Sequence, residues 1–228
     1  LRAAAPWQAI RRGAAGASQG RVLVRPEDFR VMRFRDRRET TAIFVIDASG
    51  SAAMHRLAEA KGAVELLLGD CYARRDNVAL VAFRGKSAEI ILPPTRSLAC
   101  AKRRLQGLPG GGGTPLACGL EAALALVHGV RRKGQTPLVV LMSDGRANIG
   151  RNGTAGRAQA LQDALQAGKQ LRALGVATLA IDTSPLLAAQ TDAPTLRLAQ
   201  AMNARYIKLP LADAATISHA VRAAAREG

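Results

Sequence analysis

The stretch TAIFVI at residues 41–46 is a continuous apolar run with β-branched side chains, bounded by charged residues before it and by glycine after it. Such a run is typical of a strand buried on both faces of a sheet. From residue 51 to residue 75 the apolar positions recur every three to four residues, which predicts a long helix. A buried strand followed by an amphipathic helix is the repeating unit of a mostly parallel sheet, so this stretch decides the fold class.

The rest of the chain repeats the alternation of strands and helices. Further strands are predicted at residues 77–83, 88–92, 138–142, 176–181 and 206–209, and further helices at residues 98–108, 116–127, 155–174, 196–202 and 212–226. The run at 88–92 follows its predecessor at hairpin spacing, which predicts one short antiparallel edge strand that Pro93 and Pro94 end. We therefore expect an α/β fold, Rossmann-like and doubly wound, with a mostly parallel sheet and helices on both faces.

The domain organisation follows from a change in pattern near residue 21. Residues 1–20 are rich in Ala, Gly and Arg without a sustained period, which indicates a linker or peripheral segment. The domain itself is expected over residues 21–228, with edge-strand patterns at 22–24 and 29–34. The chain begins at Leu1 and shows no apolar run of the kind a secretory signal contains, and we expect it to be part of a longer protein.

Composition limits the function classes. The 228 residues carry 33 Lys and Arg against 17 Asp and Glu, a net charge of +16, which predicts attraction to an anionic partner. A basic nucleic-acid-binding domain is one alternative, but aromatic residues make up only 3% of the chain and offer little for base stacking. No apolar run approaches the roughly 20 residues of a membrane span. Three cysteines indicate reduced thiols and a cytoplasmic protein.

Candidate functional residues follow the predicted strands, where ligands bind in open parallel sheets. Five oxygen-bearing side chains lie there: Asp47, Ser49, Ser51, Thr114 and Asp144. Carboxylates and hydroxyls without His or Cys select a hard cation, so we predict that these five bind Mg²⁺, or Mn²⁺ in its place. An Asp-x-Ser ahead of a helix is commonly only an N-cap, but a cap needs one residue and does not explain the other two strand ends.

There are two enzymatic alternatives, one that uses the same residues and one that uses a different segment. Asp47 after the first strand, with Mg²⁺ and Thr114, would also suit a phosphohydrolase in which Asp47 is the nucleophile. Such enzymes generally carry a second acid two residues on, where this chain has Ser49. A P-loop is excluded because the nearest match, at residues 129–136, lacks the lysine and does not follow a strand. We therefore predict no catalytic residue.

The pattern Asp47-x-Ser49-x-Ser51 with Thr114 and Asp144 resembles the metal-ion-dependent adhesion site of von Willebrand factor A-type and integrin I domains. Longer stretches resemble the C-terminal region of the D subunit of magnesium chelatases: residues 60–64, 75–80, 82–85, 92–97, 112–116 and 143–148, the last reading SDGRAN. Together they cover most of residues 25–210.

The resemblance implies a binding module and not an enzyme by itself. Subunits of that family work with an AAA+ ATPase subunit and a large porphyrin-binding subunit to insert Mg²⁺ into protoporphyrin IX, an ATP-driven ligase reaction on the route to chlorophyll or bacteriochlorophyll. It implies a bacterial cytoplasmic location, or the chloroplast stroma in a plant or alga, and an AAA+ module outside this chain.

The expected partner contact is a carboxylate, from either of those subunits, that completes the shell of the bound ion. We expect Gly113 and Arg146 beside the site to contact the partner, and the basic cluster Lys102, Arg103 and Arg104 to speed docking.

Overall fold

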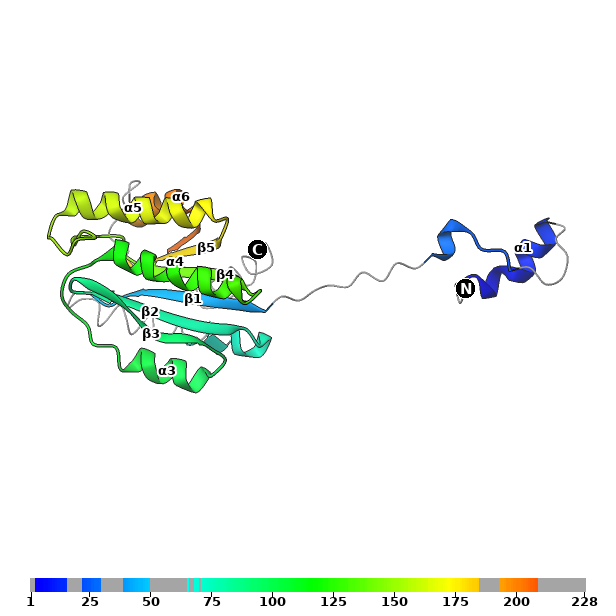
Figure 1. Ribbon diagram of the computed structural model, residues 1–228, viewed down its shortest axis with the longest axis horizontal. Helices are drawn as coiled ribbons and strands as arrows, with labels where there is room; N and C mark the ends of the chain where they lie inside the picture. Colours follow the sequence, from blue (N-terminus) through cyan, green and yellow to red (C-terminus); the bar gives the residue numbers. More distant parts are fainter. Residues whose placement is uncertain are drawn as a thin grey trace. The chain divides into compact units, whose positions relative to one another are not determined.

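The computed structural model describes residues 3–15, 22–29, 39–49, 65, 68–69, 71–184 and 193–208. Contacts divide the chain into two units, Leu1–Arg37 and Arg38–Gly228, each described here by itself (Figure 1). In the smaller unit, Leu23 and Asp28 bond to side chains of the helix that precedes them, and the division expected between residues 20 and 21 stays a prediction. No helix within the described ranges is long and apolar enough to cross a membrane.

The larger unit is built on one six-stranded sheet in the order β3-β2-β1-β4-β5-β6 (Figure 1). Its strands are β1 (Thr40–Asp47), β2 (Asn77–Arg84), β3 (Ser87–Thr95), β4 (Thr136–Ser143), β5 (Ala177–Asp182) and β6 (Arg205–Lys208). All neighbouring pairs are parallel except β2 and β3. The predicted fold class, with one antiparallel edge strand and β1 in the middle of the sheet, is confirmed.

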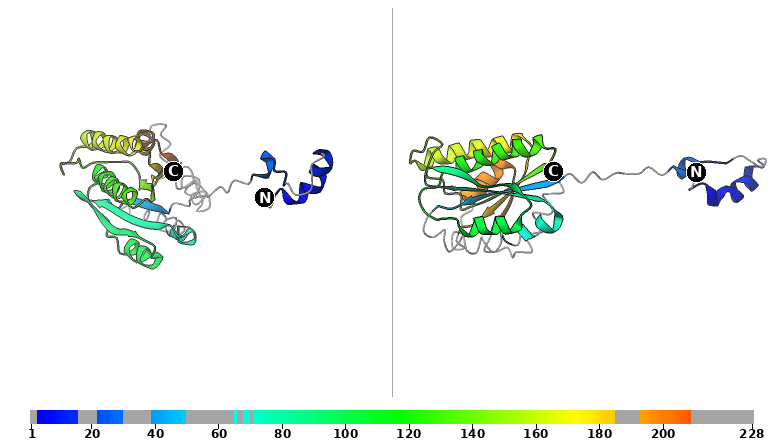
Figure 2. Two further views of the ribbon diagram at one scale, coloured as in Figure 1. Left: turned by 45° about the vertical axis from the view of Figure 1, so that its right-hand side comes forward. Right: turned by 60° about the horizontal axis from the view of Figure 1, so that its bottom comes forward.

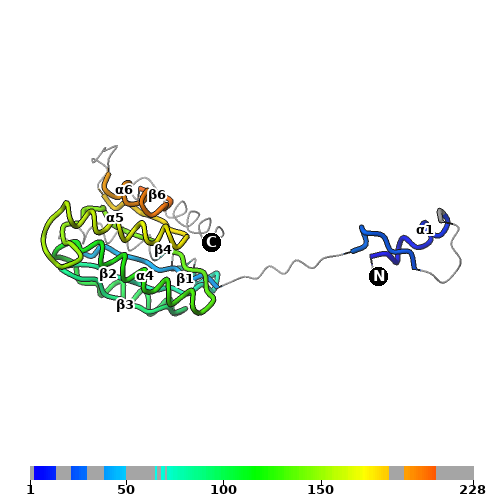
Figure 3. The backbone as a smooth tube through the Cα atoms, turned by 45° about the horizontal axis from the view of Figure 1, so that its top comes forward, coloured from blue at the N-terminus to red at the C-terminus, as the bar shows by residue number. Residues whose placement is uncertain are grey.

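Alternate residues of β1 enter two separate cores, which explains its continuous apolar sequence. Ile43 and Val45 pack into the core under α4 (Leu116–Arg132), α5 (Arg157–Ala173) and α6 (Pro194–Met202). Phe44 and Ile46 pack into the core on the opposite face, with α3 (Leu98–Gln106). Figure 2 (right) shows α4 and α5 above the sheet and α3 below it, and Figure 3 shows α4 and α5 running along the strands.

Two local predictions were wrong. Strand β3 does not stop at Pro93 and Pro94 but continues to Thr95, and its register against β2 shifts between Val78 and Leu80 and again between Leu80 and Val81. An edge strand tolerates proline because one side of it needs no ladder donors. The expected strand at residues 22–24 is irregular and leads into the 3-10 helix η2 (Pro26–Asp28).

Two predicted helices fall largely or wholly outside the described residues. Of the helix expected over residues 51–75, the described residues 65, 68–69 and 71–74 are helical. The helix expected at residues 212–226 lies outside the described part of the chain.

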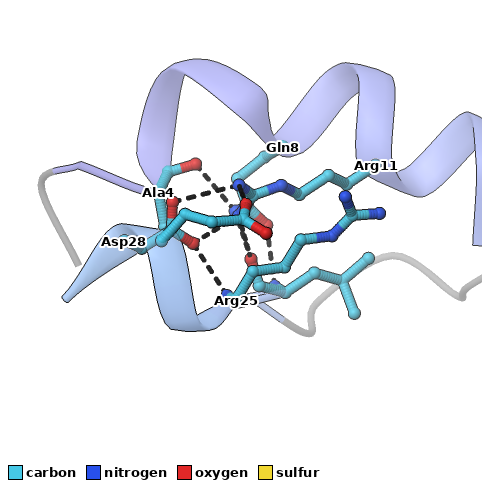
Figure 4. Close-up of polar contacts among 7 residues, drawn as sticks. Ala4, Gln8, Arg11, Arg25 and Asp28 are labelled. Atoms are coloured by element: carbon cyan, nitrogen blue, oxygen red, sulfur yellow. Dashed lines mark hydrogen bonds and ion pairs between the residues drawn. The ribbon is translucent and has the colours of Figure 1, made fainter.

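The smaller unit consists of η1 (Ala5–Trp7), α1 (Gln8–Ala15) and η2, held by side chains of α1 (Figure 4). The Gln8 amide pairs with both backbone groups of Leu23, at 2.8 Å for each bond. The buried Arg11 guanidinium makes a two-bond ion pair with Asp28, one bond of which spans 3.0 Å. These bonds and the Arg25 N–H lower the pKa of Asp28 to about 2.

Candidate functional site

The candidate site lies at the carboxyl edge of the two central parallel strands. Asp47 ends β1 and Ser143 ends β4, and the register pairs Ile46 with Met142, so Asp47 and Ser143 lie side by side. The Ser143 hydroxyl donates to Asp47 Oδ2 at 2.8 Å. The strand register therefore delivers a carboxylate and a hydroxyl to one point of the sheet edge.

The other oxygen of Asp47 joins two more of the predicted ligands. Asp47 Oδ1 accepts from the Ser49 N–H at 3.0 Å and from the Ser49 hydroxyl at 2.6 Å. Ser49 Oγ in turn lies 2.7 Å from Thr114 Oγ1. Three of the five predicted ligands thus form one continuous hydrogen-bonded chain, although Thr114 is 65 residues away from Ser49 in sequence.

Asp144, the second predicted carboxylate, directly follows β4 and is half-buried. Its Oδ1 accepts the Arg146 N–H at 3.0 Å, which turns the chain away from the strand. Asp144 is close enough for its charge to act on Asp47. Burial of Asp47 is the largest effect on its pKa and raises it, the bonds from Ser49 and Ser143 oppose the rise, and the negative charge of Asp144 adds to it.

Ser51 lies outside the described residues, so its part in the site stays a prediction. The basic cluster Lys102, Arg103 and Arg104 lies on α3, where Lys102 pairs with Glu65 at 3.5 Å while the two arginines are exposed.

The two expected partner contacts beside the site differ from each other. Arg146 is exposed next to Asp144. Gly113 has a packing reason to be glycine, because a Cβ there would lie 2.5 Å from Ile149 Cγ1 and 2.8 Å from the Gly85 carbonyl oxygen. Both residues stay predictions as partner contacts.

Three residues near the site were not predicted to take part in it. Ser143 bonds to Asp47, and the register of the parallel strands was the signal that could have found it. Asn148 bonds to the backbone of Thr114 across 34 residues of sequence, which no local pattern reveals. Asp182 ends β5 beside Ser143, but it is buried and accepts bonds from the Ser184 N–H at 2.8 Å and the Tyr206 hydroxyl at 2.6 Å.

The chemistry of this donor set fits a hard cation. The donors are carboxylate and hydroxyl oxygens, which Mg²⁺ prefers. Six oxygens around Mg²⁺ at ~2.1 Å are separated from their neighbours by roughly 3 Å, and the 2.6 and 2.7 Å separations along the chain Asp47, Ser49, Thr114 are close to that spacing. Within the described ranges, no three His, Cys, Asp or Glu side chains form a metal-ligand group.

The fold and the strand-end cluster define a class of protein. A model of the von Willebrand factor type A domain matches residues 42–146. The structure is also similar to the vWF domain of the type V pili tip protein Mfa5 from Porphyromonas gingivalis, with a TM-score of 0.62 and 12% identity over 82% of this chain and 95% of that one. The chain has the fold of a von Willebrand factor type A domain.

Sequence relatives narrow the class further. The chain is 56% identical to the magnesium-chelatase 60 kDa subunit of Cereibacter sphaeroides and 48% identical to that of Rhodobacter capsulatus, in each case over 98% of this chain. It spans 39% of the length of each relative. Residues 42–146 therefore match the von Willebrand factor type A family, and nearly the whole chain is similar in sequence to a part of these magnesium-chelatase subunits.

Proposed function

We propose that this chain is a Mg²⁺-dependent protein-interaction domain of a magnesium chelatase, with the cation held by Asp47, Ser49, Ser51, Thr114 and Asp144. The observation that carries the proposal is the hydrogen-bonded chain from Asp47 through Ser49 to Thr114 at the sheet edge. The similarity to magnesium-chelatase subunits supports the choice of complex. Ser51 enters through the Asp-x-Ser-x-Ser spacing alone.

The mix of ligands determines what such a site does. Asp47 contributes negative charge, whereas Ser49 and Thr114 are neutral hydroxyls that take little positive charge from a cation. Bound Mg²⁺ supplies a positive centre that attracts a carboxylate oxygen of a partner. The ion is then resident and adhesive, and it is not the ion inserted into the porphyrin.

Asp47 is better suited to holding a cation than to attacking a phosphoryl group. Both of its carboxylate oxygens accept hydrogen bonds from side chains, Oδ1 from Ser49 and Oδ2 from Ser143. These bonds fix its orientation at the end of β1. We therefore assign the domain a binding role, without catalysis of its own, in a complex that inserts Mg²⁺ into protoporphyrin IX at the expense of ATP.

The partners we propose are the AAA+ ATPase subunit and the large porphyrin-binding subunit, one of which supplies the carboxylate. Gly113 and Arg146 border the site, and Arg103 and Arg104 are exposed on α3. With a net charge of +16 on the chain, these basic side chains are expected to speed association with an acidic surface, to an extent that falls as salt screens the charges.

The test is calorimetric titration of this chain with the separately purified AAA+ subunit, in Mg²⁺ and in EDTA, with both proteins shown to be folded in each buffer. We expect binding in Mg²⁺ only, loss of binding for Asp47→Ala, and wild-type binding for Glu39→Ala. Glu39 is the matched control because it precedes the same strand at its opposite end. Binding that survives EDTA and Asp47→Ala would overturn the proposal.

A further inference from the structure

The segment that precedes Thr114 is fixed by its backbone alone, through the Gly111 N–H that donates to the Ala48 carbonyl at 2.9 Å. Residues 110–113 are four consecutive glycines, and Gly111 and Gly112 adopt φ values of +118° and +88°. Glycine is the residue with the largest conformational freedom to lose. Helix α4 begins only at Leu116. The Thr114 hydroxyl therefore follows a run without side chains that could pack and fix it.

Asn148 restrains the backbone on both sides of Thr114. Asn148 Oδ1 accepts the Thr114 N–H at 2.6 Å. The Thr114 carbonyl accepts the N–H of Asn148 at 3.2 Å and that of Ile149 at 3.4 Å. The peptide groups before and after Thr114 are thus both bound by residues 148–149. These bonds restrict the direction of the Thr114 side chain.

That segment is itself tied into a closed loop. The Asn148 carbonyl accepts the Gly156 N–H at 2.9 Å, and Ile149 pairs with Ala155 as an isolated antiparallel bridge. Inside the loop the Gly150 N–H donates to the Thr154 carbonyl at 2.9 Å. Each bond shortens the stretch of chain that is free to move, so together they fix the backbone position of Asn148.

The loop is also anchored to two helices of the larger unit. Asp163 on α5 is buried and accepts the Arg151 N–H at 2.9 Å. The Arg151 side chain makes an ion pair with Glu121 on α4, the helix that follows Thr114. At the other side, Ile149 packs so closely on Gly113 that a Cβ on residue 113 would have no space. The loop therefore holds both the residue before Thr114 and Thr114 itself.

We propose that Asn148 is a positioning residue for the cation site: it acts through the backbone of Thr114 to hold the Thr114 hydroxyl against Ser49. The inference rests on the metal site proposed above and names the residue on which the geometry of that site depends. Groups that orient metal ligands typically change metal affinity by ~10- to 100-fold when they are removed.

The experiment measures Mg²⁺ affinity by calorimetry, and the melting temperature of the metal-free protein, for three variants of this chain. Asn148→Ala removes the acceptor and should weaken Mg²⁺ binding at least ~10-fold. Asn148→Asp keeps an acceptor of the same size and should bind Mg²⁺ no more weakly than wild type. Asn152→Ala is the matched control, because Asn152 Oδ1 accepts the Thr154 N–H in the same loop and should leave the affinity within about two-fold.

A double-variant comparison tests whether Asn148 acts through Thr114. Thr114→Ala removes the hydroxyl that Asn148 positions, so adding Asn148→Ala to it should weaken binding no further. If Asn148→Ala does not fold, Asn148→Ser takes its place. We expect the same loss of Mg²⁺ affinity, because a serine side chain at this position is too short to reach the Thr114 N–H.

The outcomes separate this inference from the function on which it rests. A lower melting temperature for Asn148→Ala with unchanged Mg²⁺ affinity would show a structural role only and overturn the inference. If Asp47→Ala abolishes Mg²⁺ binding while Asn148→Ala does not weaken it, the metal site stands and the positioning role fails. If neither Asp47→Ala nor Thr114→Ala affects Mg²⁺ binding, the proposed function itself fails.

Discussion

A carboxylate that accepts several hydrogen bonds lies at each end of strand β1. The two carboxylates have neighbours of opposite electrostatic effect. Glu39, just before the strand, is exposed and bonds to the Arg96 guanidinium and, at 3.0 Å, to the Gln135 amide. Asp47, at the end of the strand, accepts from the hydroxyls of Ser49 and Ser143 and lies near the like charge of Asp144.

The pKa shifts follow this difference in neighbours. The Arg96 side chain holds the pKa of Glu39 below its ordinary value. Burial raises the pKa of Asp47, and Asp144 adds to the rise. The charge of Glu39 is balanced by a cation of the protein, whereas the bonds to Asp47 come from neutral groups. This difference supports the proposal that the carboxyl edge binds a cation from solution.

The largest expected difference between variants at the two ends of β1 is in how much Mg²⁺ stabilises the folded protein. At a free Mg²⁺ concentration 100 times the dissociation constant, wild type should gain about 2.7 kcal/mol of unfolding free energy. A gain of that size raises the melting temperature of a domain of this length by roughly 5 to 10 °C. Asp47→Asn should gain nothing, and Glu39→Gln should gain as much as wild type. Calorimetric melting curves with and without Mg²⁺ measure this, and an equal gain in Asp47→Asn would remove the distinction between the ends.

The pH dependence of the metal-free protein should differ in sign between the two ends, with a smaller effect. Because the pKa of Asp47 is raised in the folded state, its charged form destabilises the fold, and stability is lost as pH rises from about 4 through that pKa. The pKa of Glu39 is lowered, so its contribution is present above about pH 4.5 and is lost as pH falls.

Urea unfolding between pH 4 and 7, in EDTA, measures both contributions. Asp47→Asn should become more stable relative to wild type as pH rises, and Glu39→Gln should become slightly less stable relative to wild type. If both variants respond to pH with the same sign, the electrostatic contrast is wrong.

The sequence predicts those features of the fold and the site that depend on local patterns of residues. The apolar run of β1 is visible at residues 41–46 because both faces of the strand are buried. Asp47 was found because the ends of parallel strands meet at one edge, and Thr114 because the glycine run places it at the start of a helix on that edge. These features need only the periodicity of the chain and a rule of topology.

Features set by contacts between distant residues were not found. Asn148 meets Thr114 only after the chain has returned from β4, and Ser143 meets Asp47 through strand register. Strand β3 was expected at the edge of the sheet, but it continues through the two prolines that were expected to end it, because an edge strand tolerates proline. Arg11 likewise meets Asp28 across 17 residues of sequence.

The proposed function requires that the carboxyl edge of β1 bind a divalent cation through Asp47. The most direct measurement is titration of Mn²⁺, as a paramagnetic substitute for Mg²⁺, followed by electron paramagnetic resonance in wild type, Asp47→Ala and Glu39→Ala. We expect one bound Mn²⁺ that Mg²⁺ displaces in wild type and Glu39→Ala, and an affinity at least ~100-fold weaker in Asp47→Ala. Equal Mn²⁺ binding by all three proteins would contradict it.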